Sequence, residues 1–400
     1  MNKLIFSITL GCLVMPFLLS GQDPQDDTAG FRFTDEISLP ATPVSDQHRT
    51  GTCWSFSALS FLESEMLRLK KPETNFSEMF IVHHTYAEKA RKYVRMHGNT
   101  TFGPGGAFHD VTNMMRKYGI IPEEVYAGLN YGEEKHVHGE MDGILSQQVN
   151  AVVKNPNRKL SEVWFEPILA TLDAYLGVIP QRFEYQGKSY SPQSFLREYT
   201  GLNPNDYVEI TSFSHHPFYQ RFILEIPDNW SWDEMYNVPL DEMEEIIDNS
   251  LRNGYTVAWA ADVSEKGFLT SNKGVAMVPV KKVEDMTNAE ILRWEKLSDK
   301  EKEDETFKLD KPAPELEITQ ELRQLEFDNY MTTDDHGMHI IGLAKDQTGK
   351  IYYKVKNSWG DYNKFDGYFY ASKAYVRYKT TCLMVHKDAI PQHIREKLKL

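Results

Sequence analysis

The spacing of hydrophobic positions predicts helices in the first part of the chain. From Cys53, apolar side chains recur at helical spacing through CWSFSALSFLESEMLRLKK, and basic residues gather at the end of the run. This pattern predicts a long, largely buried helix that begins at Cys53. A second helix is predicted in SEMFIVHHTYAEKARKYVRMHG, with Ser77 as its cap. A third is predicted in AFHDVTNMMRKYG, where Gly119 ends the helical pattern.

The periodicity becomes strand-like in the second half of the chain. Residues 131–200 keep helical spacing with proline breaks and show no chemistry of their own, which indicates a helical insertion. From Tyr207, short runs alternate apolar and polar residues around one amphipathic helix, LDEMEEIIDNSLRNG. The alternation resumes in GMHIIGLAK, KIYYKVKNSW and GYFYAS, after a charge-dense stretch at residues 283–326 that is predicted to be solvated. The predicted fold class is α+β, with a helical lobe, an antiparallel β lobe and a helical insertion.

These patterns predict a definite order of segments along the chain. They are a signal peptide (1–21), a flexible N-terminal segment (22–35), a helical lobe that contains Cys53 (36–130), a helical insertion (131–202), the first part of the β lobe (203–282), a charged insertion (283–328), the second part of the β lobe (329–390) and a C-terminal tail (391–400).

The first residues have the pattern of an export signal. MNKLIFSITLGCLVMPFLLSGQ combines a basic start at Lys3, an apolar run and small residues at Ser20 and Gly21. A membrane anchor is the alternative interpretation, but Pro16 interrupts the run and it is shorter than the roughly 20 residues that span a bilayer. We expect an exported protein, periplasmic or secreted, with no stable membrane anchor in its mature form.

Composition and charge narrow the possible partners. The chain has 400 residues, of which 41% are hydrophobic, so it can bury the core of two packed lobes. Its 44 basic and 58 acidic residues give a net charge of −14, which repels phosphate backbones and argues against a nucleic-acid partner. After signal removal only Cys53 and Cys382 remain, so Cys53 is available as a reactive thiol.

The window Gln47-His48-Arg49-Thr50-Gly51-Thr52-Cys53-Trp54 carries the strongest chemical signal. A helix start lowers the pKa of a cysteine through its unpaired N–H groups and dipole, and Cys53 is predicted to occupy such a start. Gln47 lies six positions upstream, so a turn through Gly51 brings its amide beside the Cys53 N–H. Two such donors form an oxyanion hole. A structural buried cysteine is the alternative for a lone Cys.

A second window supplies a base for this thiol. Asp335-His336-Gly337 precedes Lys356-Asn357-Ser358-Trp359-Gly360, and 21 positions separate His336 from Asn357. Two antiparallel strands joined by the KDQTGK turn would lay the two side chains together. Asn357 would then fix the tautomer of the His336 imidazole, and Trp359 would shield their hydrogen bond from water.

The other histidines are given structural roles. His339 points to the opposite face of the predicted strand from His336, because side chains alternate along a strand. His83, His84, His215 and His216 show no metal-ligand spacing, so the sequence predicts neither a metal nor a cofactor.

Together, Gln47, the GTCWSF run, His336 and KNSWG resemble the papain superfamily of cysteine peptidases, whose catalytic set is Cys-His-Asn. The chain has Thr50-Gly51-Thr52 where secreted cathepsins carry another cysteine, and its Cys-to-His spacing of 283 residues is unusually long. Both departures are typical of one branch, the bleomycin hydrolase and aminopeptidase C family. The chain resembles this family over residues 36–390, including the segment GPGGAFHDVTNMMRKYGIIPEE.

The resemblance implies a papain-like two-lobe fold and a catalytic set. Cys53 would be the nucleophile and His336 the base. Asn357 would orient the His336 ring, and Gln47 would donate a hydrogen bond to the oxyanion. Gly105 and Gly106 would run beside the substrate backbone, which agrees with the close approach that glycine permits. Asp335 either adds negative potential near a cationic substrate group or is a solvated surface carboxylate.

The resemblance also implies peptide substrates, cleavage at amino ends and a possible homo-hexamer with its active sites facing a central chamber. Relatives limit cleavage to amino ends by placing their C-terminal tail in the cleft, and the tail here looks shorter. An endopeptidase, a dipeptide-releasing enzyme and a thiol acyltransferase therefore stay open as alternatives, and a non-catalytic binding protein is disfavoured by the intact residue set.

Overall fold

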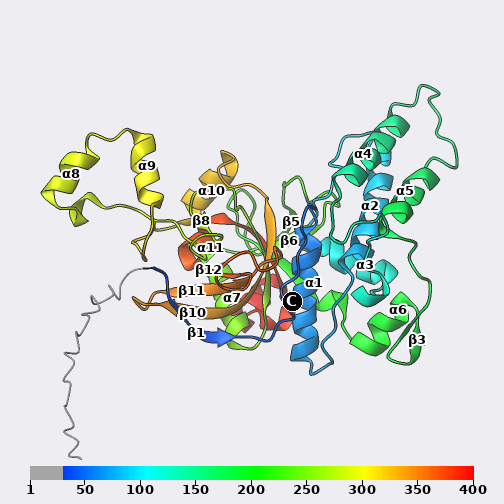
Figure 1. The fold of residues 1–400 in the computed structure, drawn as a ribbon, viewed down its shortest axis with the longest axis horizontal. Helices are drawn as coiled ribbons and strands as arrows, with labels where there is room; N and C mark the ends of the chain where they lie inside the picture. Colours follow the sequence, from blue (N-terminus) through cyan, green and yellow to red (C-terminus); the bar gives the residue numbers. More distant parts are fainter. Residues whose placement is uncertain (1–29) are drawn as a thin grey trace, which may run out of the picture.

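The computed structural model describes residues 30–400, which form a helical lobe and a β lobe side by side (Figure 1). The predicted signal peptide, residues 1–21, lies outside the described residues. The helix α1 (Cys53–Arg68) runs between the lobes and packs against strand β10 (His336–Asp346) of the sheet. The predicted helix and the predicted histidine strand therefore meet at the boundary between the two lobes.

The helical lobe follows the expected pattern. As predicted, Ser77 caps the second helix by accepting a hydrogen bond from the Phe80 N–H, and Gly119 ends the third with a positive φ of 91°. Its helices, in chain order, are α1, α2 (Glu78–Arg95), α3 (Phe108–Tyr118), α4 (Gly139–Val153), α5 (Glu166–Leu176), α6 (Pro192–Ser194) and the short helical turns Glu123–Val125, Phe195–Thr200 and Pro204–Asp206.

Within residues 30–400, eleven strands form one sheet in the β lobe. Along the sheet the order is β5 (Arg221–Ile223), β6 (Glu234–Asn237), β4 (Tyr207–Thr211), β13 (Thr380–His386), β7 (Val257–Ala261), β10, β11 (Ile351–Lys356), β12 (Tyr368–Ser372), β9 (Val275–Ala276) and β8 (Phe268–Leu269), and β1 (Phe33–Ser38) pairs with β10. Most pairs are antiparallel, but β4–β6 and β12–β9 are parallel. The strand β4 begins at Tyr207, where the change of periodicity predicted a new lobe.

Helices cover the β lobe on the outside. They are α7 (Leu240–Arg252), α10 (Gln320–Asp328), α11 (Lys373–Lys379) and α12 (Gln392–Leu398), with the short turn Lys387–Ala389. The short turn Val283–Asp285 leads to α8 (Asn288–Trp294) and α9 (Asp299–Phe307), which instead project away from the sheet (Figure 1). None of the described side chains of α8 and α9 is buried, as the charge-dense sequence predicts.

Two segments differ from the sequence prediction. Strand β1 starts at Phe33, within the stretch 22–35 expected to be flexible, because Phe33 packs face to face on Tyr370 and pairs with Asp346. The insertion at 131–202 contains, besides helices, a hairpin of β2 (Phe183–Tyr185) and β3 (Lys188–Tyr190).

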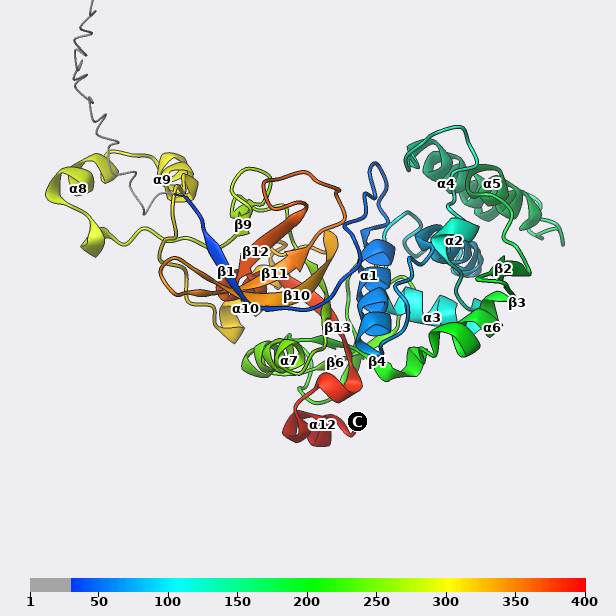
Figure 2. The same ribbon diagram turned by 60° about the horizontal axis from the view of Figure 1, so that its bottom comes forward.

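Two large apolar cores hold the fold. One lies among α1, α2, α3, α4 and α5, and the other lies between the sheet and α7, α11 and α12. Ile394 and Leu398 of α12 are buried in the second core, so the end of the described chain packs beside α7 (Figure 2).

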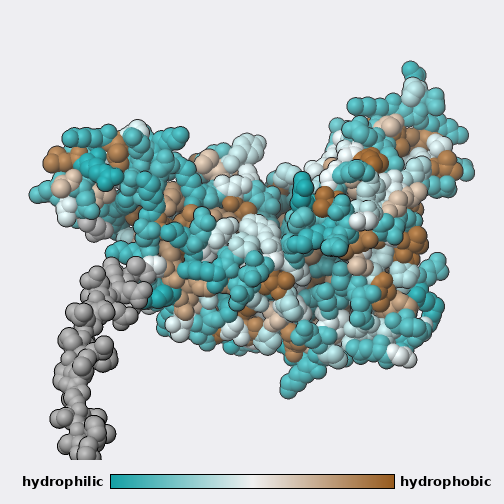
Figure 3. Space-filling model, viewed as in Figure 1, coloured by the Kyte–Doolittle hydropathy of each residue, from teal (hydrophilic) through white to brown (hydrophobic). Residues whose placement is uncertain are grey.

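The surface is mainly hydrophilic, with scattered apolar side chains, and its upper edge is hollowed between the projecting helices of the two lobes (Figure 3). Within residues 30–400, no helix combines the length and apolar character that a bilayer crossing requires.

Candidate active site

Cys53 is the first residue of α1, as the sequence predicts. No side chain caps this helix and no acidic residue lies in its first turn, so its first N–H groups are left to other acceptors. The adjacent Trp54 anchors the start of the helix by donating from its Nε1 to the carbonyl of Pro104 at 2.9 Å. The Ser55 N–H bonds to the Thr52 carbonyl at 2.9 Å, and the Trp54 N–H bonds to the Cys53 thiol, so the start of α1 is fixed around the sulfur.

Cys53 and His336 line the same small cavity, of about 20 Å³, between the two lobes. The Cys53 thiol accepts a hydrogen bond from the backbone N–H of Gly337, the residue after the histidine. A side chain at position 337 would come within 2.6 Å of Ser57 Oγ and 3.3 Å of the Cys53 carbonyl. Glycine at this position is what lets β10 approach the start of α1 closely enough to bring sulfur and imidazole into one cavity.

His336 Nε2 lies 2.8 Å from Oδ1 of Asn357, and both residues are buried. The Asn357 amide is oriented by two other bonds: Oδ1 accepts from the Ser358 N–H at 2.9 Å, and Nδ2 donates to the Tyr362 hydroxyl at 3.2 Å. Since Oδ1 can only accept, Nε2 must carry the ring proton. The unprotonated Nδ1 of His336 is therefore the atom available to take a proton.

Trp359 covers this pair. Its ring stacks on the His336 imidazole with centroids 4.7 Å apart and an interplanar angle of 27°. Phe268 and Tyr362 pack edge-on against the same indole. Trp359 therefore lies against the His336 ring, where the sequence predicts that it shields the His336–Asn357 hydrogen bond from water.

The electrostatics differ from the expectation for a helix start. Burial raises the pKa of the Cys53 thiol to about 12, with the nearby charges of Asp228 and Asp334 acting in the same direction; the Gly337 and Trp54 N–H groups oppose this. Burial also lowers the pKa of His336 to about 4, although the hydrogen bond to Asn357 acts to raise it. With these pKa values the thiol and the imidazole are both neutral at pH 7, so Cys53 can donate a proton and His336 can accept one.

Gln47 is held with its amide in a defined orientation. Its Oε1 accepts from the Ser358 hydroxyl at 2.6 Å and its Nε2 donates to the Thr50 carbonyl at 2.9 Å. Its backbone N–H also bonds to the Ser358 carbonyl. The Thr50 carbonyl takes one of the two Nε2 hydrogens, which leaves the second for another acceptor. Sequence reasoning missed Ser358, although it stands within the KNSWG motif.

The glycines of the GPGG run lie against the start of α1. Gly106 lines the cavity with Cys53, and a Cβ there would approach Trp54 to 2.8 Å. A side chain on Gly105 would overlap the Asp228 carboxylate. The buried ammonium of Lys89 donates to the carbonyls of Gly103, at 2.9 Å, and of Gly105. These two hydrogen bonds fix the backbone of the GPGG loop.

Two carboxyl groups that the sequence did not single out complete the cavity. Asp228 and Asp334 both line it and both are partly buried. Burial, followed by the charge of Asp228, raises the pKa of Asp334 to about 8, and burial raises that of Asp228. Asp335, which the sequence did single out, instead accepts hydrogen bonds from the Val263 and Ser264 N–H groups, so it holds a turn.

His339 lies away from the thiol, as the strand alternation predicts. Its Nδ1 is 3.0 Å from Ser60 Oγ on α1, and burial keeps its pKa well below the usual value. Of these two histidines, His336 is the one that lines the cavity of Cys53.

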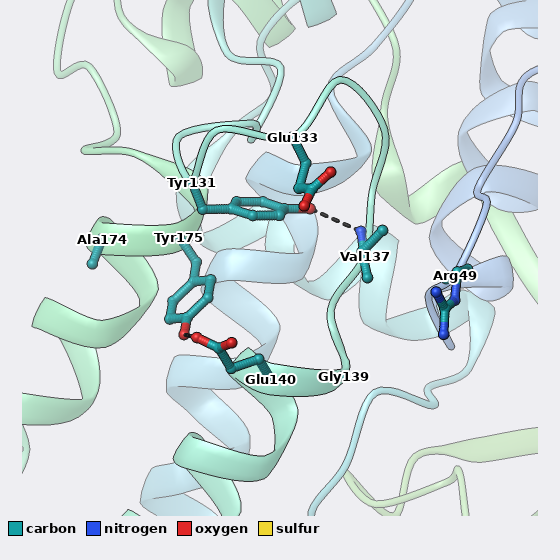
Figure 4. Close-up of a pocket in the computed structure, with 8 residues that line it drawn as sticks. All are labelled: Arg49, Tyr131, Glu133, Val137, Gly139, Glu140, Ala174 and Tyr175. Carbon is teal, nitrogen blue, oxygen red and sulfur yellow. Dashed lines mark hydrogen bonds between the residues drawn. The ribbon is translucent and has the colours of Figure 1, made fainter.

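A wider hollow of about 660 Å³ lies next to this site (Figure 4). It is open to solvent between the loop that carries Gln47 and the insertion, and it contains neither Cys53 nor His336. Its lining residues are Arg49, Tyr131, Glu133, Val137, Gly139, Glu140, Ala174 and Tyr175.

Known proteins resemble the chain over nearly its whole length. The Peptidase C1-like family matches residues 22–308 and 313–400. Aminopeptidase C of Streptococcus thermophilus is 23% identical over 403 residues, covering 89% of this chain and 83% of the relative. The mitochondrial Cysteine proteinase 1 of Saccharomyces cerevisiae is 20% identical over 414 residues, covering 91% of this chain and 79% of the relative. The crystal structure of PepW from Lactobacillus rhamnosis HN001 superposes with a TM-score of 0.67 at 20% identity, covering 92% of this chain and 84% of the PepW chain.

Proposed function

Because the chain belongs to the Peptidase C1-like family and is a cysteine peptidase, we propose that it removes residues from the free amino ends of peptides, with Cys53 as its nucleophile. The observation that carries the proposal is the shared cavity of Cys53 and His336, with the Nε2–H of His336 held by Asn357.

The proposed reaction is acyl transfer through a thioester. As the Cys53 sulfur attacks the substrate carbonyl, its proton passes to Nδ1 of His336, and the carbonyl oxygen gains negative charge. The free hydrogen on Gln47 Nε2 and the Cys53 N–H would stabilise that oxygen. The imidazolium then protonates the departing amine, and water hydrolyses the thioester with His336 acting again as base.

The carboxyl groups in the cavity support a preference for a free amine. Burial raises the pKa of both Asp228 and Asp334, and the charge of Asp228 raises that of Asp334 further, so both carboxyl groups resist ionisation. A substrate ammonium entering the cavity would favour both carboxylates and be favoured by them. Relatives named Aminopeptidase C point the same way. We therefore assign these two residues to recognition of the substrate amino group.

Paired peptides test this function. Each peptide is supplied with a free and with an acetylated amino end and is digested by the wild-type enzyme and by Cys53→Ala, and the products are read by mass spectrometry. The proposal expects single residues released from the free peptides only, and no product with the variant. Internal cuts in acetylated peptides would show an endopeptidase, release of dipeptides a dipeptidyl peptidase, and acyl-amine products with an added amine a transferase.

Export and assembly are proposed on sequence features alone. We propose that residues 1–21 are removed during export to the periplasm or medium, which N-terminal sequencing of the protein from its native host would test. We also propose a homo-hexamer, and native mass spectrometry of the mature protein would reveal a monomer if that assignment is wrong.

A further inference from the structure

A group of metal-binding side chains lies on the β lobe outside the active-site cavity. Glu225 faces two histidines at once: His215 Nε2 is 3.0 Å from one carboxylate oxygen, and His216 Nε2 is 2.9 Å from the other. The ligand atoms of the three residues all lie within 4.8 Å of one another. The three side chains are accessible to solvent, so an ion can reach them.

Packing fixes both imidazole rings. The His216 ring stacks on Phe222 with centroids 4.2 Å apart and an interplanar angle of 25°. The His215 ring lies nearly parallel to Phe327 of α10, with centroids 5.8 Å apart. The two histidines follow β4, whereas Phe222 belongs to strand β5 and Phe327 to helix α10. Fixed rings lower the entropy that would be lost when an ion is bound.

Gln324 stands behind His215 and suits either tautomer of its ring. Nδ1 of His215 lies 3.1 Å from the Gln324 Nε2 and 3.4 Å from its Oε1. In one tautomer, Nε2–H of His215 donates to Glu225, and Nδ1 accepts from the Gln324 amide nitrogen. When Nε2 binds a metal, the ring proton moves to Nδ1 and the amide oxygen accepts it. Such a partner on the second ring nitrogen is typical of metal-binding histidines.

We propose that His215, His216 and Glu225 bind one divalent transition-metal ion of the zinc type. Two imidazole nitrogens and a carboxylate oxygen are the ligands such ions prefer, at about 2.0 to 2.2 Å from the ion. Atoms bound at that distance in a tetrahedron are about 3.4 Å apart. Small side-chain rotations therefore open the two hydrogen bonds and close the triangle around the ion, and water completes the coordination.

The position of the site links it to the cavity wall. Glu225 directly precedes Ile226 and lies three positions before Asp228, and both Ile226 and Asp228 line the cavity of Cys53. A bound ion would tie that wall to the loop before β5 and to α10. The sequence concealed the site because adjacent histidines have no recognisable ligand spacing and Glu225 is nine residues further on.

The experiment uses the full chain with Cys53→Ala, so that the active-site thiol cannot bind the ion. Zn²⁺ binding is measured by calorimetry, and Co²⁺ is titrated as a spectroscopic probe. We expect one ion per chain, Co²⁺ absorption bands without a thiolate band, and a higher Tm with Zn²⁺. His216→Ala and Glu225→Gln should weaken binding more than about 100-fold, and Gln324→Leu about 10-fold.

His393→Ala provides the matched control, because His393 is an exposed histidine 3.4 Å from a single carboxylate, that of Glu245. It should leave Zn²⁺ affinity unchanged. Equal Zn²⁺ affinity in His216→Ala, Glu225→Gln and the parent protein would overturn the proposal, whatever the peptidase activity proves to be. Glu225→Gln keeps the shape of an exposed side chain, so a loss of binding in it cannot come from unfolding.

Discussion

Asn357 holds His336 by a single hydrogen bond, 2.8 Å from Oδ1 to Nε2, and is itself fixed by Ser358 and Tyr362. This relation determines which ring nitrogen is free to accept a proton. His336 and Asn357 lie 21 positions apart in the chain, and the β10–β11 hairpin brings them together. The orientation of one amide thus sets the base of the proposed reaction.

Asn357→Ala should lower kcat/KM by about 100-fold, within the range for a positioned general acid–base. The ring would lose the acceptor that selects its tautomer, while substrate contacts stay in place, so KM should change little. Asn357→Asp supplies an acceptor but adds a charge, which would raise the pKa of His336 and move the acid limb of the pH–rate profile to higher pH. An unchanged pH profile in Asn357→Asp would contradict the assigned contact.

Gln47→Ala should lower kcat by about 100- to 1,000-fold with little change in KM, as expected for loss of one oxyanion donor. Ser358→Ala removes the hydroxyl that orients the Gln47 amide at 2.6 Å, so a loss of about 10-fold is expected. Steady-state kinetics on one peptide substrate measures both. A rise in KM alone would instead assign Gln47 to ground-state binding.

Asp228→Asn should raise KM about 10-fold for peptides with a free amino end, because about 1.4 kcal/mol of charge interaction is lost. Removing this negative charge also lowers the pKa of Cys53, since Asp228 acts to raise it. Iodoacetamide should therefore label Cys53 faster in the variant at a given alkaline pH. Asp310→Asn, at a carboxylate that is 90% exposed, is the control. If Asp228→Asn and Asp310→Asn have the same KM for these peptides, Asp228 does not recognise the substrate amine.

Acid should destabilise the fold through buried histidines. Burial lowers the pKa values of His136 and His138 to about 4, below the ordinary value near 6.5. Above pH 6.5 both states hold neutral rings; as the pH falls from 6.5 towards 4, the unfolded chain takes up protons that the folded chain does not. Each histidine then lowers the free energy of unfolding by roughly 1 kcal/mol per pH unit.

Urea unfolding of His138→Phe tests this. Neither ring nitrogen of His138 has a hydrogen-bond partner among the described residues, so phenylalanine should be tolerated at pH 8 and should flatten the loss of stability at pH 5. His97→Gln, at an exposed position, should leave the slope as in the wild type. An equally steep slope in His138→Phe would contradict a neutral buried ring.

Local sequence predicted much of the fold and the residues brought together at the site. The helical spacing after Cys53 predicted α1, and the turn between two alternating runs predicted the β10–β11 hairpin. Asp228 and Asp334 had no such pattern, because they lie in loops whose meeting depends on the packing of the whole β lobe. The raised pKa of Cys53 was missed for the same reason: the sequence revealed the helix start, but the enclosing residues are distant in the chain.

The missed hairpin has a local cause. Gln186 and Gly187 between β2 and β3 both have positive φ, of 47° and 77°. A two-residue turn of this kind before an alternating run is a hairpin signal, and the surrounding helical spacing concealed it.

The most direct test of the central claim is the site and number of labels left by a peptidyl epoxide, measured by mass spectrometry in parallel with the loss of peptidase activity. One label per chain on Cys53, with activity falling in proportion and Cys382 unlabelled, is the predicted result. Peptidase activity that persists when Cys53 is fully labelled would contradict the account.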